Sequence, residues 1–211
     1  MTNGAGAPAH LPGGGRSAYC IPAMPPEPSD EALMLQYRDG DAGAFDSLYA
    51  RHKGGLYRYL LRQCREPALA EEIFQDVWMN LIRARATYTV QAKFTTYLYH
   101  LGHNRLIDHY RRQGHASVAS FDTEDGPGVE EVADEQAVSP EDGYDARRQA
   151  SELLRLIGEL PAPQREAFLL QQEGGMSVEE IAAATGVTRE TAKSRLRYAM
   201  ARLRKGLNAW L

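Results

Sequence analysis

Apolar residues recur at helical spacing through two stretches of the chain, and no segment alternates between apolar and polar residues with the period of a strand. In the first stretch, Asp41 stands where it can cap a helix, and the helical pattern begins at Ser29. Pro67 suits the first turn of the next helix, and a third helix is predicted over roughly 92–112. The helix after Pro67 carries one broad apolar stripe of adjacent pairs four residues apart: Ile73 and Phe74, Val77 and Trp78, and Leu81 and Ile82.

The second stretch predicts four further helices, around 146–159, 163–173, 177–184 and 188–207. Pro161 and Pro163 separate the first two of these helices, and Gly174 with Gly175 ends the second. Together the two stretches predict an all-α protein, with two small helical domains joined by a flexible linker.

Composition divides the chain into four parts: a Pro/Gly-rich extension at 1–28, a helical domain at 29–113, an acidic linker at 114–145 and a second helical domain at 146–211. The extension holds six of the 11 prolines and almost no charge, so it is expected to be disordered. Met24 lies near its end, and the hypothesis that translation starts there and not at Met1 would be tested by the intact mass of the native protein.

The charge pattern changes the meaning of the overall net charge of −4, which by itself argues against a nucleic-acid partner. Residues 1–113 have a net charge of +2, residues 114–145 a net charge of −10, and residues 146–211 a net charge of +4. Two mildly basic domains therefore flank an acidic segment. The sequence predicts a cytoplasmic protein with no membrane insertion. Its two cysteines lack zinc spacing, and it has neither an apolar run of membrane-spanning length nor a signal-peptide pattern.

Residues 177–207 carry the pattern of a helix-turn-helix. Ser177 and Glu180 have the spacing of a capping box, and Gly186 provides a turn before a strongly basic helix. One face of that helix is expected to be buried: Ala192, Leu196, Ala199, Met200, Leu203 and Leu207. A solvated cationic face is the alternative, but a capped short helix, a glycine turn and a basic helix in series favour docking in a DNA major groove. The candidate DNA contacts are Arg189, Glu190, Lys193, Ser194, Arg195 and Arg197.

The segment 91–112 interleaves basic residues with aromatic residues that are able to stack on unpaired bases, namely Phe94, Tyr97, Tyr99, His103, His109 and Tyr110. The alternative is that Phe94, Tyr97, Leu98 and Leu101, which have helical spacing, belong to the core. A second alternative is a metal site built from His100, His103, Asp108 and His109.

Five motifs in order resemble the extracytoplasmic-function group of bacterial RNA polymerase sigma factors, and the resemblance covers residues 30–207. The motifs are Ala44 to Tyr49, Ala70 to Trp78, Phe94 to Arg112, Leu160 to Leu170 and Ser177 to Leu207. In the last of these motifs, the resemblance includes the run Ala192-Lys193-Ser194-Arg195-Leu196. The chain departs from the pattern at Tyr97, where Trp is common, at Gly102-His103, where Ala-Arg is common, and at Glu190-Thr191-Ala192, where Gly-Thr-Val is common. A glycine inside the helix is expected to cost about 1 kcal/mol relative to alanine.

The resemblance implies a transcription initiation factor that has no catalytic residues and no cofactor, and that binds core RNA polymerase and promoter DNA. It implies that residues 29–113 form sigma region 2 and residues 146–211 form sigma region 4, which reads the minus-thirty-five element. The residues implied at the minus-ten element are Tyr97, His100, Asn104, Arg105, His109, Arg111 and Arg112, together with the loop around 84–96. Those implied at the β′ clamp helices of polymerase are Glu72, Gln75, Asp76, Met79 and Asn80.

The resemblance also implies that region 4 meets the β flap, that the acidic linker follows the RNA path of polymerase, and that an anti-sigma factor holds the protein inactive. Two other classes of protein remain open. A stand-alone regulator would bind an operator without polymerase, and a small hydrolase using His100, His103, Asp108 and His109 would contain bound metal.

Overall fold

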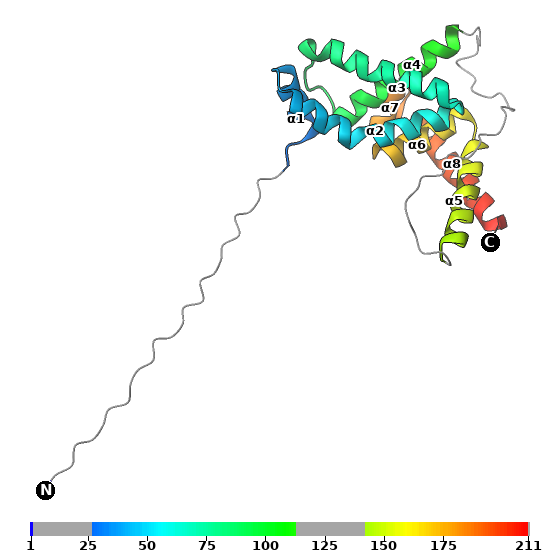
Figure 1. Cartoon of the computed structure of the whole chain (residues 1–211). Coiled ribbons are helices and arrows are strands. Elements are labelled where there is room, and N and C mark those ends of the chain that lie inside the picture. Colours follow the sequence, from blue (N-terminus) through cyan, green and yellow to red (C-terminus); the bar gives the residue numbers. More distant parts are fainter. Residues whose placement is uncertain (2–26, 113–141, 211) are drawn as a thin grey trace.

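The computed structural model of the chain describes residue 1, residues 27–112 and residues 142–210, and every regular element in these parts is helical. The N-terminal group of helices comprises α1 (Asp30–Arg38), α2 (Ala42–Cys64), α3 (Pro67–Ala84), the single 3-10 turn η1 (Arg85–Thr87) and α4 (Phe94–Arg112). The C-terminal group comprises α5 (Asp142–Gly158), α6 (Ala162–Gly174), α7 (Val178–Thr185) and α8 (Arg189–Trp210), as Figure 1 shows. The all-α prediction is confirmed. None of the described helices is both long and apolar enough to cross a membrane.

The helix ends that local sequence signals predicted are confirmed. The Asp41 side chain accepts a hydrogen bond from the N–H of Gly43 at 2.9 Å at the start of α2, and Pro67 begins α3. Ser177 and Glu180 form the reciprocal capping box of α7. Gly186 ends α7 with a φ of +67°, a left-handed conformation that glycine adopts without steric cost.

The boundary between the predicted linker and the second helical domain differs from the one expected. Helix α5 begins at Asp142, within the segment that was expected to be linker. The predicted disorder of the N-terminal extension and most of the acidic linker fall on residues 2–26 and 113–141, which lie outside the described residues.

The core of the N-terminal group is formed where α1, α3 and α4 pack around α2. Fully buried leucines of α2 belong to the same hydrophobic cluster as Val77 and Leu81 of α3 and Leu98 of α4. An aromatic cluster extends this core outward, with the Tyr49 and Trp78 ring centroids 4.9 Å apart.

The C-terminal group buries the predicted face of α8 with one exception. Ala192, Leu196, Ala199 and Leu203 are buried, and Leu207 is partly buried against the same core. Met200 was expected on this face but is 39 % exposed, so that part of the prediction is wrong. The buried stripe runs along positions 192, 196, 199 and 203, and Met200 lies one position beyond it, where the helix has already turned toward solvent.

The two groups of helices pack directly against each other. Helix α6 lies along α2, and α7 lies along α4 (Figure 1). At Gly55 of α2 the approach is so close that a Cβ atom would lie 3.1 Å from the carbonyl oxygen of Glu173. The structure is therefore a closed arrangement, in which residues of one group complete the hydrogen bonding of the other.

Candidate nucleic-acid interface

The helix-turn-helix consists of α7, a turn at Gly186 and α8. Helix α8 is capped by Thr188, whose hydroxyl accepts a hydrogen bond from the N–H of Thr191 at 3.2 Å. Of the six candidate DNA contacts, Arg189, Glu190, Lys193 and Arg197 are exposed, and Ser194 and Arg195 are partly exposed. The first turns of α8 therefore present a contiguous polar and cationic surface.

Two of these cations already have partners within the chain. Arg189 forms ion pairs with Glu179 and Glu190. The guanidinium of Arg197 lies 5.0 Å from the ring centroid of Tyr198, and it donates to the Tyr198 hydroxyl at 3.3 Å. Tyr198 is 51 % exposed and was not predicted as a site residue, although an aromatic residue on the polar side of a basic helix is a detectable signal.

The predicted minus-ten residues of α4 divide into exposed and covered positions. Arg111 and Arg112 are exposed at its C-terminal end. Tyr97 is half-buried against Tyr88, with ring centroids 5.5 Å apart, and burial raises the pKa of its hydroxyl. The Nε2 atom of His109 is buried and has no hydrogen-bond partner.

His100 is covered by the C-terminal group. Its Nδ1 atom donates to the carbonyl oxygen of Ala184 in α7 at 2.8 Å, and the amide of Asn104 lies 3.0 Å from Nε2. The contact with Ala184 requires a proton on Nδ1, because a carbonyl oxygen only accepts hydrogen bonds. In the closed arrangement His100 is thus engaged by α7.

Two aromatic residues that were considered for base stacking are in the core. Phe94 is fully buried, and Tyr99 is 1 % exposed, with its hydroxyl donating to the carbonyl oxygen of Glu173 at 2.9 Å. In this structure neither ring is accessible to a base, so the base-stacking interpretation is wrong for these two residues. The core alternative holds for Phe94 and Leu98, whereas Tyr97 and Leu101 are only partly buried.

The predicted polymerase-binding residues form an exposed face of α3. Glu72, Gln75, Asp76 and Met79 are exposed, and Met79 is exposed by 44 %. Asn80 is partly buried because Arg105 of α4 donates to its side-chain oxygen at 3.1 Å, and the Arg105 Nε atom lies 3.9 Å from Asp76. The predicted polymerase face and the predicted minus-ten helix therefore adjoin.

A buried carboxylate joins the two groups of helices. One oxygen of Glu166 in α6 accepts from the Tyr59 hydroxyl at 2.9 Å and bonds to Nδ1 of His103 at 2.7 Å. Tyr59 is fully buried, and Glu166 is 7 % exposed. Burial raises the pKa of the Tyr59 hydroxyl well above its ordinary value, and the charge of Glu166 raises it further.

The neighbouring Arg165 is also buried, and its hydrogen bonds go to neutral oxygens. Its Nε atom donates to the side chain of Gln63 in α2 at 2.9 Å, and its Nη1 atom donates to the carbonyl oxygens of Gly158 and Leu160 at 3.2 Å. Burial lowers the pKa of this guanidinium to about 10, so it stays charged at neutral pH. Neither Arg165 nor Glu166 was predicted as a contact between domains.

Ion pairs border this contact at its edges. Arg58 and Arg62 of α2 both bind the Glu173 carboxylate at the end of α6. Lys93, just before α4, pairs with Glu180 of α7 at 2.9 Å. Hydrogen bonds within the capping box and the pair with Lys93 lower the pKa of Glu180.

No group of three potential ligands able to hold a metal ion occurs in residues 27–112 and 142–210. His100 and His103 bond instead to Ala184 and Glu166, on separate helices of the C-terminal group. These contacts count against the metal-site alternative for the histidines of α4.

Comparison with known proteins gives the same two regions. Residues 48–116 match Sigma-70 region 2, and residues 150–203 match Sigma-70, region 4. The chain is 30 % identical over 172 residues to the RNA polymerase sigma factor CarQ of Myxococcus xanthus, a match that covers 82 % of this chain and 94 % of the relative. It is 29 % identical over 175 residues to the ECF RNA polymerase sigma factor SigK of Mycobacterium sp. strain KMS, covering 79 % of this chain and 84 % of that one.

Solved structures share the fold. The complex of CnrH with the cytosolic domain of CnrY aligns with a TM-score of 0.60 at 22 % identity, covering 86 % of this chain and 99 % of the matched one. The sigma factor RpoE of Bartonella quintana, in complex with the anti-sigma factor NepR, aligns with a TM-score of 0.59 at 23 % identity, covering 78 % and 96 %. With the sequence matches, these findings show that the chain belongs to the sigma-70 family of RNA polymerase sigma factors, in the extracytoplasmic-function group. Its function is to direct transcription initiation at promoters.

Proposed function

We propose that α8 docks in the major groove of the minus-thirty-five element, with Lys193 and Arg197 as its principal contacts. The observation that carries this proposal is the capped α7, the left-handed Gly186 and the exposed cations on the first turns of α8. Residues near the N-terminus of a recognition helix reach base edges, and the cations beyond them bind phosphates. The fixed turn supports a defined angle between the two helices.

The minus-ten element binds at α4 and at the loop that precedes it. Thr89, Val90 and Gln91 are exposed in this loop, and Val90 is exposed by 50 %. An exposed apolar side chain in this loop supports the capture of an unstacked base, because base faces pack on apolar and aromatic surfaces. Arg111 and Arg112, exposed at the far end of α4, are suited to phosphates.

Core RNA polymerase binds the exposed face of α3. Gln75 and Asp76 lie at its centre, with Met79 beside them, and polar groups around an exposed methionine are typical of a protein-binding surface. We assign this face to the β′ clamp helices, and the C-terminal group to the β flap. The protein acts without catalytic residues of its own, in the cytoplasm with its polymerase.

Promoter binding requires the closed arrangement to open. The two promoter elements are centred about 25 base pairs apart, which is roughly 85 Å of duplex at about 3.4 Å per base pair. Helix α2, the longest in the N-terminal group with 23 residues, is only about 35 Å long. Because α7 also covers His100, separation of the groups both lengthens the reach of the protein and uncovers α4.

A protein partner that keeps the groups together would hold the sigma factor inactive, and we propose an anti-sigma factor in this role. The solved structure of the related RpoE is a complex with the anti-sigma factor NepR, which supports a partner of this kind.

The test is reconstitution of the full chain with core RNA polymerase, followed by run-off transcription of genomic DNA and sequencing of the start sites. We expect start sites preceded by one shared pair of elements. The Lys193→Ala, Arg197→Ala double variant should lose these starts, whereas Arg155→Ala, which removes an exposed cation from α5, should keep them. Tight binding of the free chain to an operator, without initiation in the presence of polymerase, would instead establish a stand-alone regulator.

A further inference from the structure

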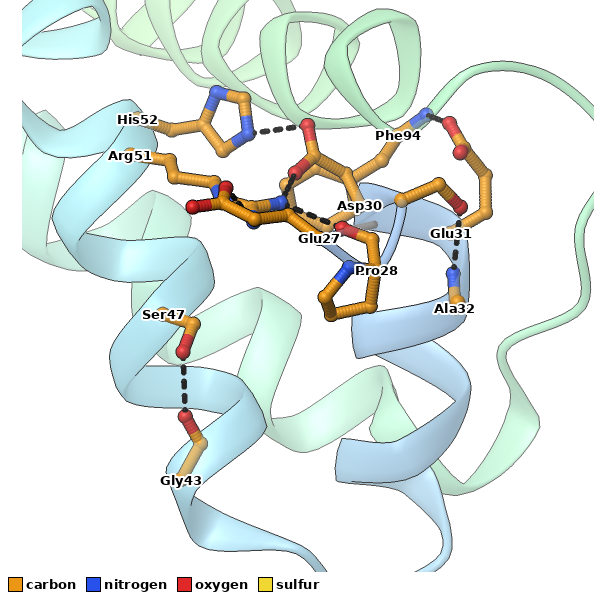
Figure 2. A network of polar contacts seen from close by, with 11 residues as sticks. Glu27, Pro28, Asp30, Glu31, Ala32, Gly43, Ser47, Arg51, His52 and Phe94 are labelled. Atoms are coloured by element: carbon orange, nitrogen blue, oxygen red, sulfur yellow. Dashed lines mark hydrogen bonds and ion pairs between the residues drawn. The ribbon is translucent and has the colours of Figure 1, made fainter. Parts of the chain in front are cut away.

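Helix α1 contacts both ends of the loop that joins α3 to α4. At the far end of the loop, the backbone N–H of Phe94 donates to the Glu31 carboxylate at 2.8 Å (Figure 2). At the near end, the guanidinium of Arg85 lies 5.3 Å from the ring centroid of Tyr37, also in α1. One helix thus supports the start and the end of the segment that we assign to the minus-ten element.

The contact at Glu31 supplies a cap that α4 lacks locally. The residue before α4 is Lys93, whose side chain has no acceptor for the unpaired N–H groups of the first turn. Glu31, which lies 63 positions earlier in the sequence, accepts from the first of them. This hydrogen bond is the main cause that lowers the pKa of Glu31, and the positive end of the helix dipole also favours a carboxylate there.

Glu31 is held on a rigid support. Its neighbour Asp30 bonds to Arg51 at 2.8 Å and to Nε2 of His52 at 2.7 Å, which ties the start of α1 to α2. The ring of His52 in turn lies 5.3 Å from the ring of Phe94. Figure 2 shows these side chains converging between α1, α2 and the start of α4, so the backbone that carries Glu31 is tied to α2 beside Phe94.

The loop itself is exposed between its two supported ends. Tyr88 is buried beneath it, whereas residues 89–93 are exposed. The ion pair of Lys93 with Glu180 comes from the C-terminal group, so it is lost when the two groups separate. The contacts made by α1 belong to the N-terminal group and remain in the open form.

We infer that Glu31 is a positioning residue for minus-ten recognition: its carboxylate fixes the Phe94 end of the loop, so that the exposed segment 89–91 holds an unstacked base in one geometry. This inference rests on the proposed function of the loop. It adds that the sequence preference of α4 and its loop depends on a side chain of α1 that touches no DNA.

The experiment selects DNA with the reconstituted holoenzyme. The full chain and core RNA polymerase are incubated with fork-junction DNA whose single-stranded non-template segment is randomised, and retained DNA is sequenced. The variants are Glu31→Ala, which removes the acceptor, and Glu31→Gln, which keeps a neutral acceptor. Glu27→Gln is the matched control, because Glu27 lies in the same network but its hydrogen bond is with Arg51 of α2.

We expect the wild-type chain and Glu27→Gln to enrich the same short motif. Glu31→Ala should lose preference at one part of that motif and retain its preferred DNA about tenfold less well, as expected for loss of a charge-assisted hydrogen bond. Glu31→Gln should fall between these two. Binding of each variant to core polymerase, measured without DNA, should be unchanged.

Other results overturn the inference in distinguishable ways. An unchanged motif and retention in Glu31→Ala would refute the role of Glu31 and leave the loop assignment standing. Equal weakening at every position, or weaker binding to core polymerase, would mean that Glu31 serves stability alone. If the wild-type holoenzyme enriches no motif, the loop assignment fails and the role of Glu31 fails with it.

Discussion

The hydrogen bond between Tyr59 and Glu166 allows the closed arrangement to be tested by a double-mutant cycle in the full chain. Tyr59→Phe removes the hydroxyl without changing the shape of the ring, and Glu166→Ala removes the acceptor. The two residues are 107 positions apart and belong to different groups of helices. A coupling energy between them therefore arises only if the groups are packed together in solution.

The structure sets the size of that coupling. Tyr59 is fully buried, Glu166 is 7 % exposed, and their oxygens are 2.9 Å apart. A buried hydrogen bond to a charged acceptor contributes about 1.5–3 kcal/mol. Because His103 bonds to the same carboxylate oxygen, Tyr59→Phe leaves the carboxylate with one donor, and the measured coupling should lie toward the lower end of that range.

The assay is urea unfolding of the wild type, the two single variants and the double variant, followed by far-ultraviolet circular dichroism. Tyr59→Phe should destabilise the wild type but have little effect in the Glu166→Ala background. A control cycle pairs Tyr59→Phe with Glu152→Ala and should be additive, because the partly buried Glu152 carboxylate pairs with Arg155 of its own helix α5. A coupling below about 0.5 kcal/mol for Tyr59 and Glu166 would refute the packing of the two groups, since that is the scatter seen for independent sites.

Four further outcomes follow from the described contacts. Alanine at both Lys193 and Arg197 should weaken holoenzyme binding to minus-thirty-five duplex at least tenfold and flatten its salt dependence, as measured by fluorescence anisotropy at several salt concentrations. Asp76→Ala should weaken binding to core polymerase in a pull-down assay without lowering the melting temperature, because the Asp76 side chain is exposed. Gly102→Ala should stabilise the protein by up to about 1 kcal/mol in urea unfolding, because a Cβ atom there would make only ordinary contacts, the nearest at 3.5 Å. Acidification below the ordinary Glu31 pKa of 4.5 should destabilise the wild type, because the pKa of this carboxyl is lowered in the folded state and protonation then favours unfolding. In the same urea assay, the free energy of unfolding of Glu31→Gln should fall less with decreasing pH than that of the wild type.

The sequence was most informative where a single residue fixes the backbone. Asp41, Ser177 and Gly186 mark helix ends through their own side chains or conformations, and the structure has these ends where they were expected. The exposed faces of α3 and α8 were also predictable, because each of these helices has one buried side and one polar side.

Helix α4 was harder to interpret because it is buried on two sides. Phe94 and Leu98 face the core of the N-terminal group, whereas Tyr99 reaches α6. A helix packed between two layers has no single apolar stripe, so its aromatic residues look like candidates for base stacking. Glu166 gave no signal either, because its partners lie 63 and 107 positions away and a lone glutamate in an amphipathic helix usually faces water.

The buried charges between the two groups determine how easily the protein opens. Arg165 and Glu166 lose their hydration when the groups close, and they regain it when the groups separate. Hydration of these two charges therefore opposes closure of the interface, as hydration of polar groups does in a transient complex between two proteins. The covalent connection between the groups raises their effective concentration, about a thousandfold above that of free proteins at micromolar levels. The two groups of helices thus resemble two weakly associating proteins joined in one chain, so a partner that binds one arrangement better than the other shifts the protein toward that arrangement.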